Sequence, residues 1–305
     1  MATHEGATRA APVDQLRVEI VFEAAATAVP LTSIAILAGS RPQYNASMNT
    51  PDRVQHAADL IVRAHLTGAQ LETGSAEAPQ CLDEAYAVQD AVSQRLWISR
   101  GDAIRAWKTG GPNAQATPIA APIPQSRLFT SPARLPGSDF HIIGIEAELA
   151  YRLHNDLPPR AMPYVEDDVA AAVGSVHVAI EVCDSRLRDW RTVDALWKLA
   201  DMQMNGALIV GVGVADWVRI VPERQVAIVE VDAKPVGKST DSHPHGNPLR
   251  LLPWLANHCA QRYGGLRAGD VITTGAWTGM HFVEPGASVV ARFSDIGEAR
   301  VVFAH

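Results

Sequence analysis

The sequence predicts an α+β fold in which two helices lead and a largely antiparallel or mixed β core follows. Apolar residues recur at helical spacing twice before residue 100, whereas the remainder shows short β-type runs between Gly and Pro turns. Three further helical patterns interrupt these runs without alternating one for one with them. A doubly wound parallel sheet needs that alternation, so we do not predict one.

The two leading helices are marked by residues typical of helix ends. Thr50 can cap the first helix, Pro51 occupies its first helical position and Gly68 follows it. Apolar residues on one side predict the second helix over residues 82–98, and Gly101 follows that one. The chain therefore begins its patterned part with a helical layer.

Eight strands and three helices are predicted over the rest of the chain. The helix over 164–173 has acids in its first turn, another covers 193–204, and the third, over 249–262, follows Asn247 as a cap and Pro248. The predicted strands cover residues 103–107, 142–153, 176–182, 207–212, 225–231, 271–274, 288–293 and 299–303.

The patterning also suggests three parts of the chain. Residues 1–47 have no amphipathic period, so we expect a loosely held N-terminal extension there. A helix-rich part would follow over residues 48–120, and a β-rich domain over residues 121–305.

Charge and hydropathy exclude two classes of partner. The 26 basic and 33 acidic residues give a net charge of −7, and no basic run occurs, so we expect no nucleic-acid partner. The apolar stretch over 24–39 is broken by Pro30 and lacks a basic leader. It is also shorter than a bilayer span, so we expect neither a signal peptide nor a membrane partner.

The three cysteines, Cys81, Cys183 and Cys259, are odd in number and far apart. They show no metal-ligand spacing, so neither a disulfide framework nor a zinc site is predicted from them. This usage fits a reducing compartment, and we expect a cytoplasmic protein.

Two carboxylates share one face of the predicted strand over 142–153. Alternation directs Glu146 and Glu148 to the face opposite Ile145 and Ala147, with their Cα atoms about 7 Å apart. One cation could lie between them. An ordinary strand with a solvated acidic face is the alternative that this motif leaves open.

A second acidic strand strengthens the metal interpretation. In the run over 176–182, His177 and Glu181 point one way and β-branched residues the other, so Glu181 could face the same pocket. Oxygen ligands without thiolates suit Mg²⁺, Mn²⁺ or Ca²⁺. His177 could support this pocket or simply pack in the core.

An ordered series of short motifs runs from about residue 50 to residue 303. The motifs are AYAVQ at 85–89, WKTG at 107–110, IEAE at 145–148, EVCDSR at 181–186, GNPL at 246–249 and LRAGDVITTG at 266–275. In this order the chain resembles the fumarylacetoacetate hydrolase superfamily, and within it the 2-keto-4-pentenoate hydratase and 2-oxohepta-3-ene-1,7-dioate hydratase branch. The resemblance implies a mixed β-sandwich or β-roll core with a helical N-terminal part.

The resemblance implies a divalent cation, Mg²⁺ or Mn²⁺, held by Glu146, Glu148 and a third acid in the β-rich domain. Two residues compete for the third place: Glu181 matches the hydratase branch, whereas Asp184 would match the aspartate of the hydrolases. We rank Glu181 first. A 2-oxo acid would chelate the cation, which would polarise its carbonyl and stabilise the enolate form.

The resemblance also implies roles for residues around the cation. Lys108 matches an active-site lysine that acts as general acid or base, and we expect burial beside a cation to lower its pKa. Thr274, Gly275 and Thr278 match a loop that contacts the substrate carboxylate. Gln203 and Asn205 lie where the branch has an Asp-Asn-x-Ser segment, and they would replace the hydroxyl as substrate contacts.

These matches predict a cytoplasmic hydro-lyase that hydrates a 2-oxo or 2-hydroxy-dienoic acid in aromatic-compound breakdown. Three alternatives stay open: a 2-oxo acid decarboxylase, an acylpyruvate-type C–C hydrolase, and a catalytically silent partner subunit. We expect a homo-oligomer. The loop over 241–246 has two histidines that could touch substrate from a lid, but we expect it to be exposed.

Overall fold

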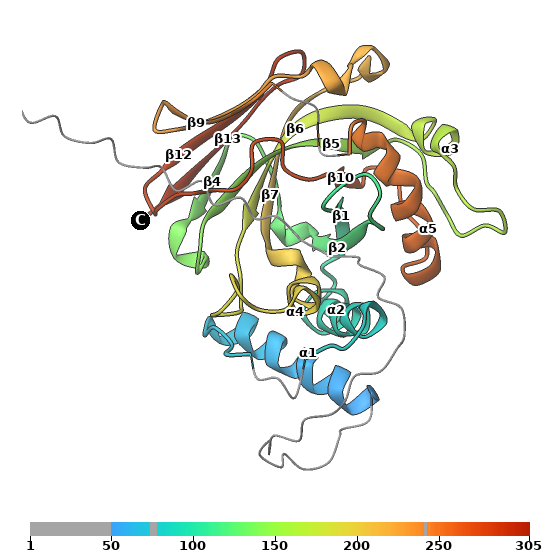
Figure 1. The fold of residues 1–305 in the computed structure, drawn as a ribbon, viewed down its shortest axis with the longest axis vertical. Coiled ribbons are helices and arrows are strands. Elements are labelled where there is room, and N and C mark those ends of the chain that lie inside the picture. The colour runs from blue at the N-terminus through green and yellow to red at the C-terminus, as the bar shows by residue number, and fades with distance from the viewer. Residues whose placement is uncertain (1–49, 74–77, 241–242, 244) are drawn as a thin grey trace, which may run out of the picture.

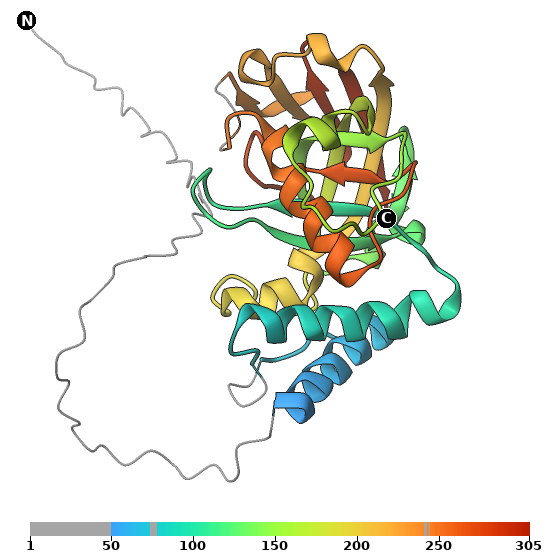
Figure 2. The same ribbon diagram turned by 90° about the vertical axis from the view of Figure 1, so that its right-hand side faces the viewer.

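Two packed β-sheets and a layer of helices at one end form the fold in the computed structural model (Figures 1 and 2). The structure describes residues 50–73, 78–240, 243 and 245–305. The predicted N-terminal extension over 1–47 lies outside the described residues. The predicted α+β class with a mixed β core is confirmed.

The helical layer consists of two long helices with a shorter one beside them. The helix α1 spans Thr50–Thr67, α2 spans Leu82–Leu96, and a 3₁₀ turn, η1, covers Ile98–Arg100. Figure 2 shows α1 and α2 stacked at one end of the sheets, with α4 (Ala195–Ala200) between α2 and the strands. Their shared apolar faces form a buried cluster that includes Met202 and Met204.

The larger sheet has eight strands in the order β2-β1-β10-β5-β6-β7-β3, with β11 paired to β5. Most pairs are antiparallel, but β1 runs parallel to β10 and β3 parallel to β7. The strands are β1 (Ile104–Gly110), β2 (Ile119–Pro124), β3 (Leu128–Thr130), β5 (Gly144–Leu153), β6 (Val173–Cys183), β7 (Asn205–Val214), β10 (Val271–Thr273) and β11 (His281–Phe282).

The smaller sheet has five strands in the order β4-β13-β12-β8-β9. The strands are β4 (Ala133–Pro136), β8 (Ala227–Val231), β9 (Lys234–Ser239), β12 (Ser288–Phe293) and β13 (Gly297–Ala304). Apolar side chains of both sheets form the largest buried cluster, so one face of β5 and β6 is sealed in the core between the sheets. The opposite face of these two strands is left for other contacts.

Two further helices and six 3₁₀ turns complete the described elements. The helix α5, which packs on the main core, contributes apolar residues to it. The bounds are α3 (Glu166–Ala170), α5 (Leu252–Arg262), η2 (Gln125–Arg127), η3 (Gly137–Asp139), η4 (Met202–Met204), η5 (Trp217–Arg219), η6 (Pro222–Arg224) and η7 (Pro248–Leu251). None of the helices in the described part of the chain is both long and apolar enough to span a bilayer.

The elements missed by sequence are mostly strands at the margins of the sheets. The edge strand β2 contains Pro122 and Pro124, and the edge strand β9 is polar, so neither shows an apolar alternation. The helix predicted over 164–173 is shorter than expected because β6 already begins at Val173. The helix predicted over 193–204 breaks at Asp201, where the backbone leaves the helical region.

Candidate metal centre

The register of β5 and β6 brings two of the predicted acids directly opposite each other. Glu146 pairs with Glu181, and Glu148 pairs with Ala179, in this antiparallel ladder. Ile145 and Ala147 on the alternate face enter the core between the sheets, so both glutamates of β5 point the other way. Directly opposite residues have Cβ atoms about 4.5–5.5 Å apart, which brings three carboxylates to one face.

This acidic cluster is buried. Glu148 is 1% exposed and Glu181 0% exposed, while Glu146 is half-buried. Burial raises the pKa of Glu148 well above its ordinary value, and the negative charges of Glu181 and Glu146 raise it further. Burial likewise raises the pKa of Glu146, with Lys108 opposing the shift. Charged carboxylates in this place need a positive partner.

The Glu181 carboxylate has one oxygen with partners and one without. Its Oε1 accepts hydrogen bonds from Lys108 Nζ at 2.6 Å and from Asn205 Nδ2 at 2.9 Å. Its Oε2 is buried and has no hydrogen-bond partner among the described residues. A buried acceptor without a partner costs about 1–3 kcal/mol, so a cation bound at this oxygen would remove a penalty. The residues present therefore fit a divalent cation.

Glu148 contacts the strand and loop that follow it in space. Its Oε2 accepts hydrogen bonds from the Thr273 hydroxyl and from the Gly275 backbone N–H, the latter at 2.7 Å. Thr273 is held in place by the register, because it pairs with Lys108 across β1 and β10. Two donors therefore fix the orientation of the Glu148 carboxylate.

Lys108 connects the acids to the turn before β7. Besides Glu181, its ammonium donates to the Gln203 carbonyl oxygen at 3.0 Å. Burial is the largest single influence on Lys108 and would lower its pKa, but the negative charges of Glu181 and of its neighbours Cys183, Glu146 and Glu148 together outweigh burial, so the pKa is raised. This direction is opposite to the expected lowering. The expectation assumed a cation beside Lys108, whose charge would offset the carboxylates.

Cys183 is a neighbour of the acids that sequence reasoning missed. Its Sγ lies 3.4 Å from Glu146 Oε2, and the ligand atoms of Glu146, Glu181 and Cys183 lie within 4.8 Å of one another. The alternation of β6 could have revealed it, because residues 181 and 183 share a face. Spacing between cysteines carries no signal for this neighbour, because the other possible ligands here are carboxylates.

Asp184, the competitor for the third acid, is engaged elsewhere. Its Oδ1 accepts the backbone N–H groups of His141 at 2.9 Å and Ile142 at 3.1 Å, and its Oδ2 lies 3.6 Å from Arg186 Nη1. Of the two acids weighed, Glu181 is the one that lies opposite Glu146.

Gln203 lies in an unusual turn between α4 and β7. Met202, Gln203 and Met204 have φ values of 53°, 51° and 61°, a left-handed conformation that side-chain-bearing residues seldom adopt in succession. The two methionines are buried among the helices, whereas the Gln203 Nε2 is buried without a hydrogen-bond partner among the described residues.

The remaining predicted site residues lie in and after β10. Thr274 is buried, and its hydroxyl donates to the Leu149 carbonyl oxygen at 2.9 Å, so Thr273 is the threonine that contacts Glu148. Thr278 is half-buried and its hydroxyl lies 3.5 Å from the Gly279 carbonyl oxygen. The structure thus brings Gly275 to the acids and leaves Thr274 and Thr278 with backbone partners.

Three histidines near this region are packed. His177 Nδ1 donates to the Gly211 carbonyl oxygen at 2.8 Å, and its Nε2 lies 2.8 Å from Ser175 Oγ. His243 and His245 are 3% and 5% exposed, so the expectation of an exposed loop was wrong for these two residues. Burial and the neighbouring His245 lower the pKa of His243 to about 4. Residues 241, 242 and 244 of that loop lie outside the described residues.

Comparison with protein families places most of the chain in one group. Residues 115–304 match the family model described as the fumarylacetoacetate (FAA) hydrolase C-terminal domain. This range contains all the acids discussed above, and Lys108 precedes it.

Curated relatives have two kinds of name. A 2-keto-4-pentenoate hydratase of Paraburkholderia xenovorans is 26% identical over 262 residues, which cover 83% of this chain and 96% of the relative. A 4-oxalocrotonate decarboxylase of a Pseudomonas species is 31% identical over 157 residues, 50% of this chain and 57% of the relative. The longer match therefore includes the helical part as well as the β-rich part.

Solved structures share the fold. The 4-oxalocrotonate decarboxylase from Pseudomonas putida G7, complexed with magnesium and adipate, superposes with a TM-score of 0.74 at 24% identity. The match covers 85% of this chain and 100% of that structure. The core is therefore of the predicted fumarylacetoacetate hydrolase type, and the chain belongs to the fumarylacetoacetate hydrolase family.

Proposed function

We propose that the chain is a divalent-metal-dependent lyase that hydrates a 2-oxo or 2-hydroxy-dienoic acid. The proposal rests first on the buried carboxylates of Glu146, Glu148 and Glu181, with the unpartnered Glu181 Oε2 as the single observation that carries it. The hydratase name of a relative that is matched over nearly its whole length favours hydration.

Glu146, Glu148 and Glu181 would hold Mg²⁺ or Mn²⁺ in this proposal. Carboxylate oxygens suit both ions, and the fold neighbour from Pseudomonas putida is complexed with magnesium. When bound, such an ion would act as a Lewis acid at the carboxylate and 2-oxo group of the substrate.

Lys108 would move the proton. Its ammonium is held by Glu181 and by the Gln203 carbonyl, so it approaches the acids with a fixed geometry. Hydration adds one proton and one hydroxide across a carbon–carbon double bond. Lys108 would deliver the proton to a substrate carbon, water would supply the hydroxide, and the remaining proton of that water would restore the lysine ammonium. A positioned acid of this kind contributes roughly 10²–10⁴-fold to rate.

Four residues would bind the substrate. The Gln203 amide is the best placed, because its Nε2 is buried without a partner among the described residues, next to the turn that binds Lys108. Gly275 reaches the same cluster through its backbone N–H. Thr274 and Thr278 would contribute from the loop after β10 if their hydroxyls exchange their backbone acceptors for substrate.

Decarboxylation of a 2-oxo acid is the second candidate. It is favoured by the decarboxylase name of a 31% identical relative and of the fold neighbour. The same carboxylates and lysine would serve it, because loss of CO₂ also leaves an enolate that must be stabilised and protonated.

A panel of 2-oxo acids and 2-hydroxy-dienoic acids with Mg²⁺ or Mn²⁺ tests the proposal. Loss of dienoate absorbance with a product heavier by one water would support hydration, whereas CO₂ release would favour the second candidate. A carboxylic acid plus pyruvate would reveal acylpyruvate hydrolysis.

The matched variants for this experiment are Glu146→Gln and Glu298→Gln. Glu146→Gln should lower metal-dependent turnover roughly 100-fold or more, whereas Glu298, which pairs with Arg292 and Arg300 in the smaller sheet, should be replaceable without loss. A fully active Glu146→Gln variant, or a wild-type chain that turns over nothing in the panel, would contradict the proposal.

A further inference from the structure

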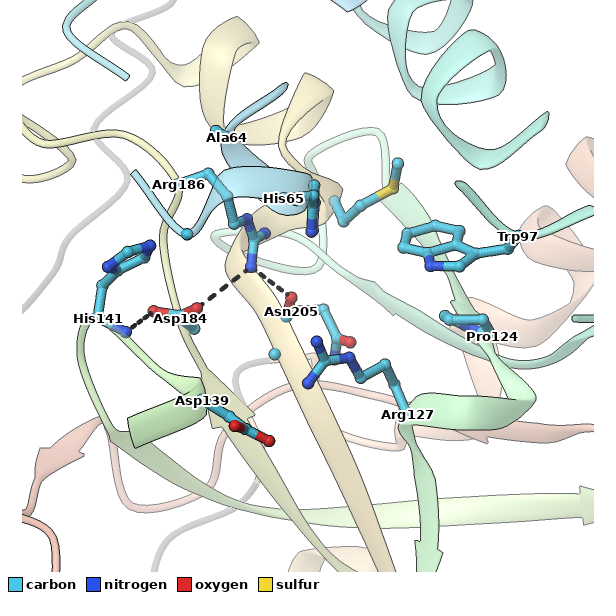
Figure 3. A pocket seen from close by; sticks show the side chains of 13 residues that line it. Ala64, His65, Trp97, Pro124, Arg127, Asp139, His141, Asp184, Arg186 and Asn205 are labelled. Atoms are coloured by element: carbon cyan, nitrogen blue, oxygen red, sulfur yellow. Dashed lines mark hydrogen bonds and ion pairs between the residues drawn. The ribbon is translucent and has the colours of Figure 1, made fainter. Parts of the chain in front are cut away.

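A polar cavity separate from the acidic cluster lies at the junction of the helical layer and the larger sheet. It has a volume of about 70 Å³ and is lined by the end of α1, the segments after α2 and β2, and the residues flanking β6 and β7 (Figure 3). Glu146, Glu148, Glu181 and Lys108 do not line it. Since one water needs roughly 10–15 Å³ of such space, the cavity has room for a small ion with its waters.

Basic side chains dominate the interior of this cavity. Figure 3 shows the guanidinium groups of Arg127 and Arg186 and the ring of His65 pointing into the same space. His141 lines the cavity at its margin. The charges of Arg186, Arg127 and His141 add to burial in lowering the pKa of His65, so the cavity favours negative charge.

The donors of Arg186 are already used. Its Nε donates to Asp201 Oδ1 at 2.7 Å, its Nη2 donates to the Asp201 carbonyl oxygen at 2.9 Å, and its Nη1 donates to the Asn205 carbonyl oxygen at 3.0 Å. Asp184, which also lines the cavity, is held by Arg186 and two backbone N–H groups. The polar atoms in this part of the wall therefore already have partners within the protein.

Arg127 and His65 are not satisfied in this way. Within the described residues the Arg127 guanidinium makes no hydrogen bond or ion pair, and the His65 Nε2 is buried without a hydrogen-bond partner. The exposed Asp139 lines the cavity but forms no ion pair with Arg127. A guanidinium and an imidazole N–H converging on one small space are the donors that bind a carboxylate or phosphate group.

We propose that this cavity binds a small oxyanion through Arg127 and His65. The ligand carries a carboxylate or a phosphate group, with two oxygens that accept from the Arg127 fork and one that accepts from His65 Nε2. The proposal does not rest on the proposed hydration, because the cavity and the acidic cluster share no charged side chain. The two sites meet at Asn205, whose amide contacts Glu181 and whose carbonyl oxygen accepts from Arg186.

The test measures anion binding to the full chain in metal-free, resin-treated buffer without carboxylate chelators. Inorganic phosphate, acetate and succinate are titrated separately at constant ionic strength, with calorimetry and thermal unfolding as readouts. One of the three should bind saturably and raise the melting temperature, and the comparison identifies whether phosphate or carboxylate is preferred.

Arg127→Gln and His65→Leu should each weaken that binding at least tenfold. Arg127→Gln should do so without lowering the melting temperature of the anion-free protein. Arg134→Gln, a change of an exposed arginine in β4 that does not line the cavity, should leave it unchanged. Glu148→Gln should also leave it unchanged, which separates this cavity from the acidic cluster. Absence of saturable binding, or equal binding by Arg127→Gln, would overturn the proposal.

Discussion

Two buried clusters of charge lie on either side of Asn205, and they differ in how their polar atoms are used. Around Arg186, the guanidinium donates to Asp201 and to the Asn205 carbonyl oxygen, and Asp184 accepts two backbone N–H groups. Around Glu181, one carboxylate oxygen has two donors and the other has none among the described residues. A closed network stabilises a fold, whereas an incomplete one is suited to take up a ligand.

Removing the arginine of the closed cluster should have the largest effect on stability. Arg186→Met leaves Asp201 buried without its partner, and we expect the free energy of unfolding to fall by about 3–5 kcal/mol. Urea unfolding followed by circular dichroism measures it. Arg188→Met is the control, because Arg188 pairs with Glu72 on the surface and should cost no more than about 1 kcal/mol. Equal losses would erase the distinction between the clusters.

Neutralising an acid of the incomplete cluster should affect ion binding more than stability. Glu148→Gln removes a buried carboxylate but keeps an acceptor for the Gly275 N–H. We expect the affinity for Mn²⁺ to fall about 10- to 100-fold, while the metal-free protein keeps or gains stability. Electron paramagnetic resonance of free Mn²⁺ measures the affinity. If the variant is destabilised but binds Mn²⁺ with unchanged affinity, the cluster stabilises the fold and does not bind the ion.

The same comparison predicts how stability depends on pH. The pKa values of Glu146 and Glu148 are raised, so the folded metal-free protein binds these protons more tightly than the unfolded chain does. Its stability should therefore decrease as pH rises from the ordinary carboxylate range through the raised values. Saturating Mn²⁺ should offset the decrease near neutrality. Melting temperatures between pH 5 and 8, with and without Mn²⁺, would show whether the two curves diverge.

The smallest effect is expected at the left-handed turn. Gln203→Gly should keep or raise stability by up to about 1 kcal/mol, because glycine tolerates positive φ, while raising KM through loss of the amide. Ala233→Gly, at a left-handed position in the β8–β9 hairpin, should give a similar stability change with an unaltered KM. Identical KM effects in both variants would remove Gln203 from the substrate site.

The sequence carries enough information to predict the strands that form the acidic cluster. Strict alternation in β5 and β6 separates the apolar faces from Glu146, Glu148 and Glu181, and that pattern survives in the observed register. Edge strands such as β2 lack this signal, because proline and small residues are tolerated where one side has no partner.

Contacts between distant segments could not be predicted in the same way. Asn205 and Cys183 approach the acids because β6 and β7 pair and these residues lie at the ends of those strands, and neither residue type forms a local motif here. The break at Asp201 was invisible because the apolar spacing continues through Met202 and Met204, whose side chains pack on the helices from a non-helical backbone.

That turn has a consequence for truncated versions of the chain. The unfavourable backbone of Met202–Met204 is held by the burial of its methionines against α1 and α2, which precede the family-matched range of 115–304. A fragment limited to that range would lose Lys108. It would also lose the apolar helix faces that hold the Met202–Met204 turn, and with it the Gln203 carbonyl that accepts from Lys108. Chimeras that exchange catalytic halves between relatives should therefore carry their own helical layer with them.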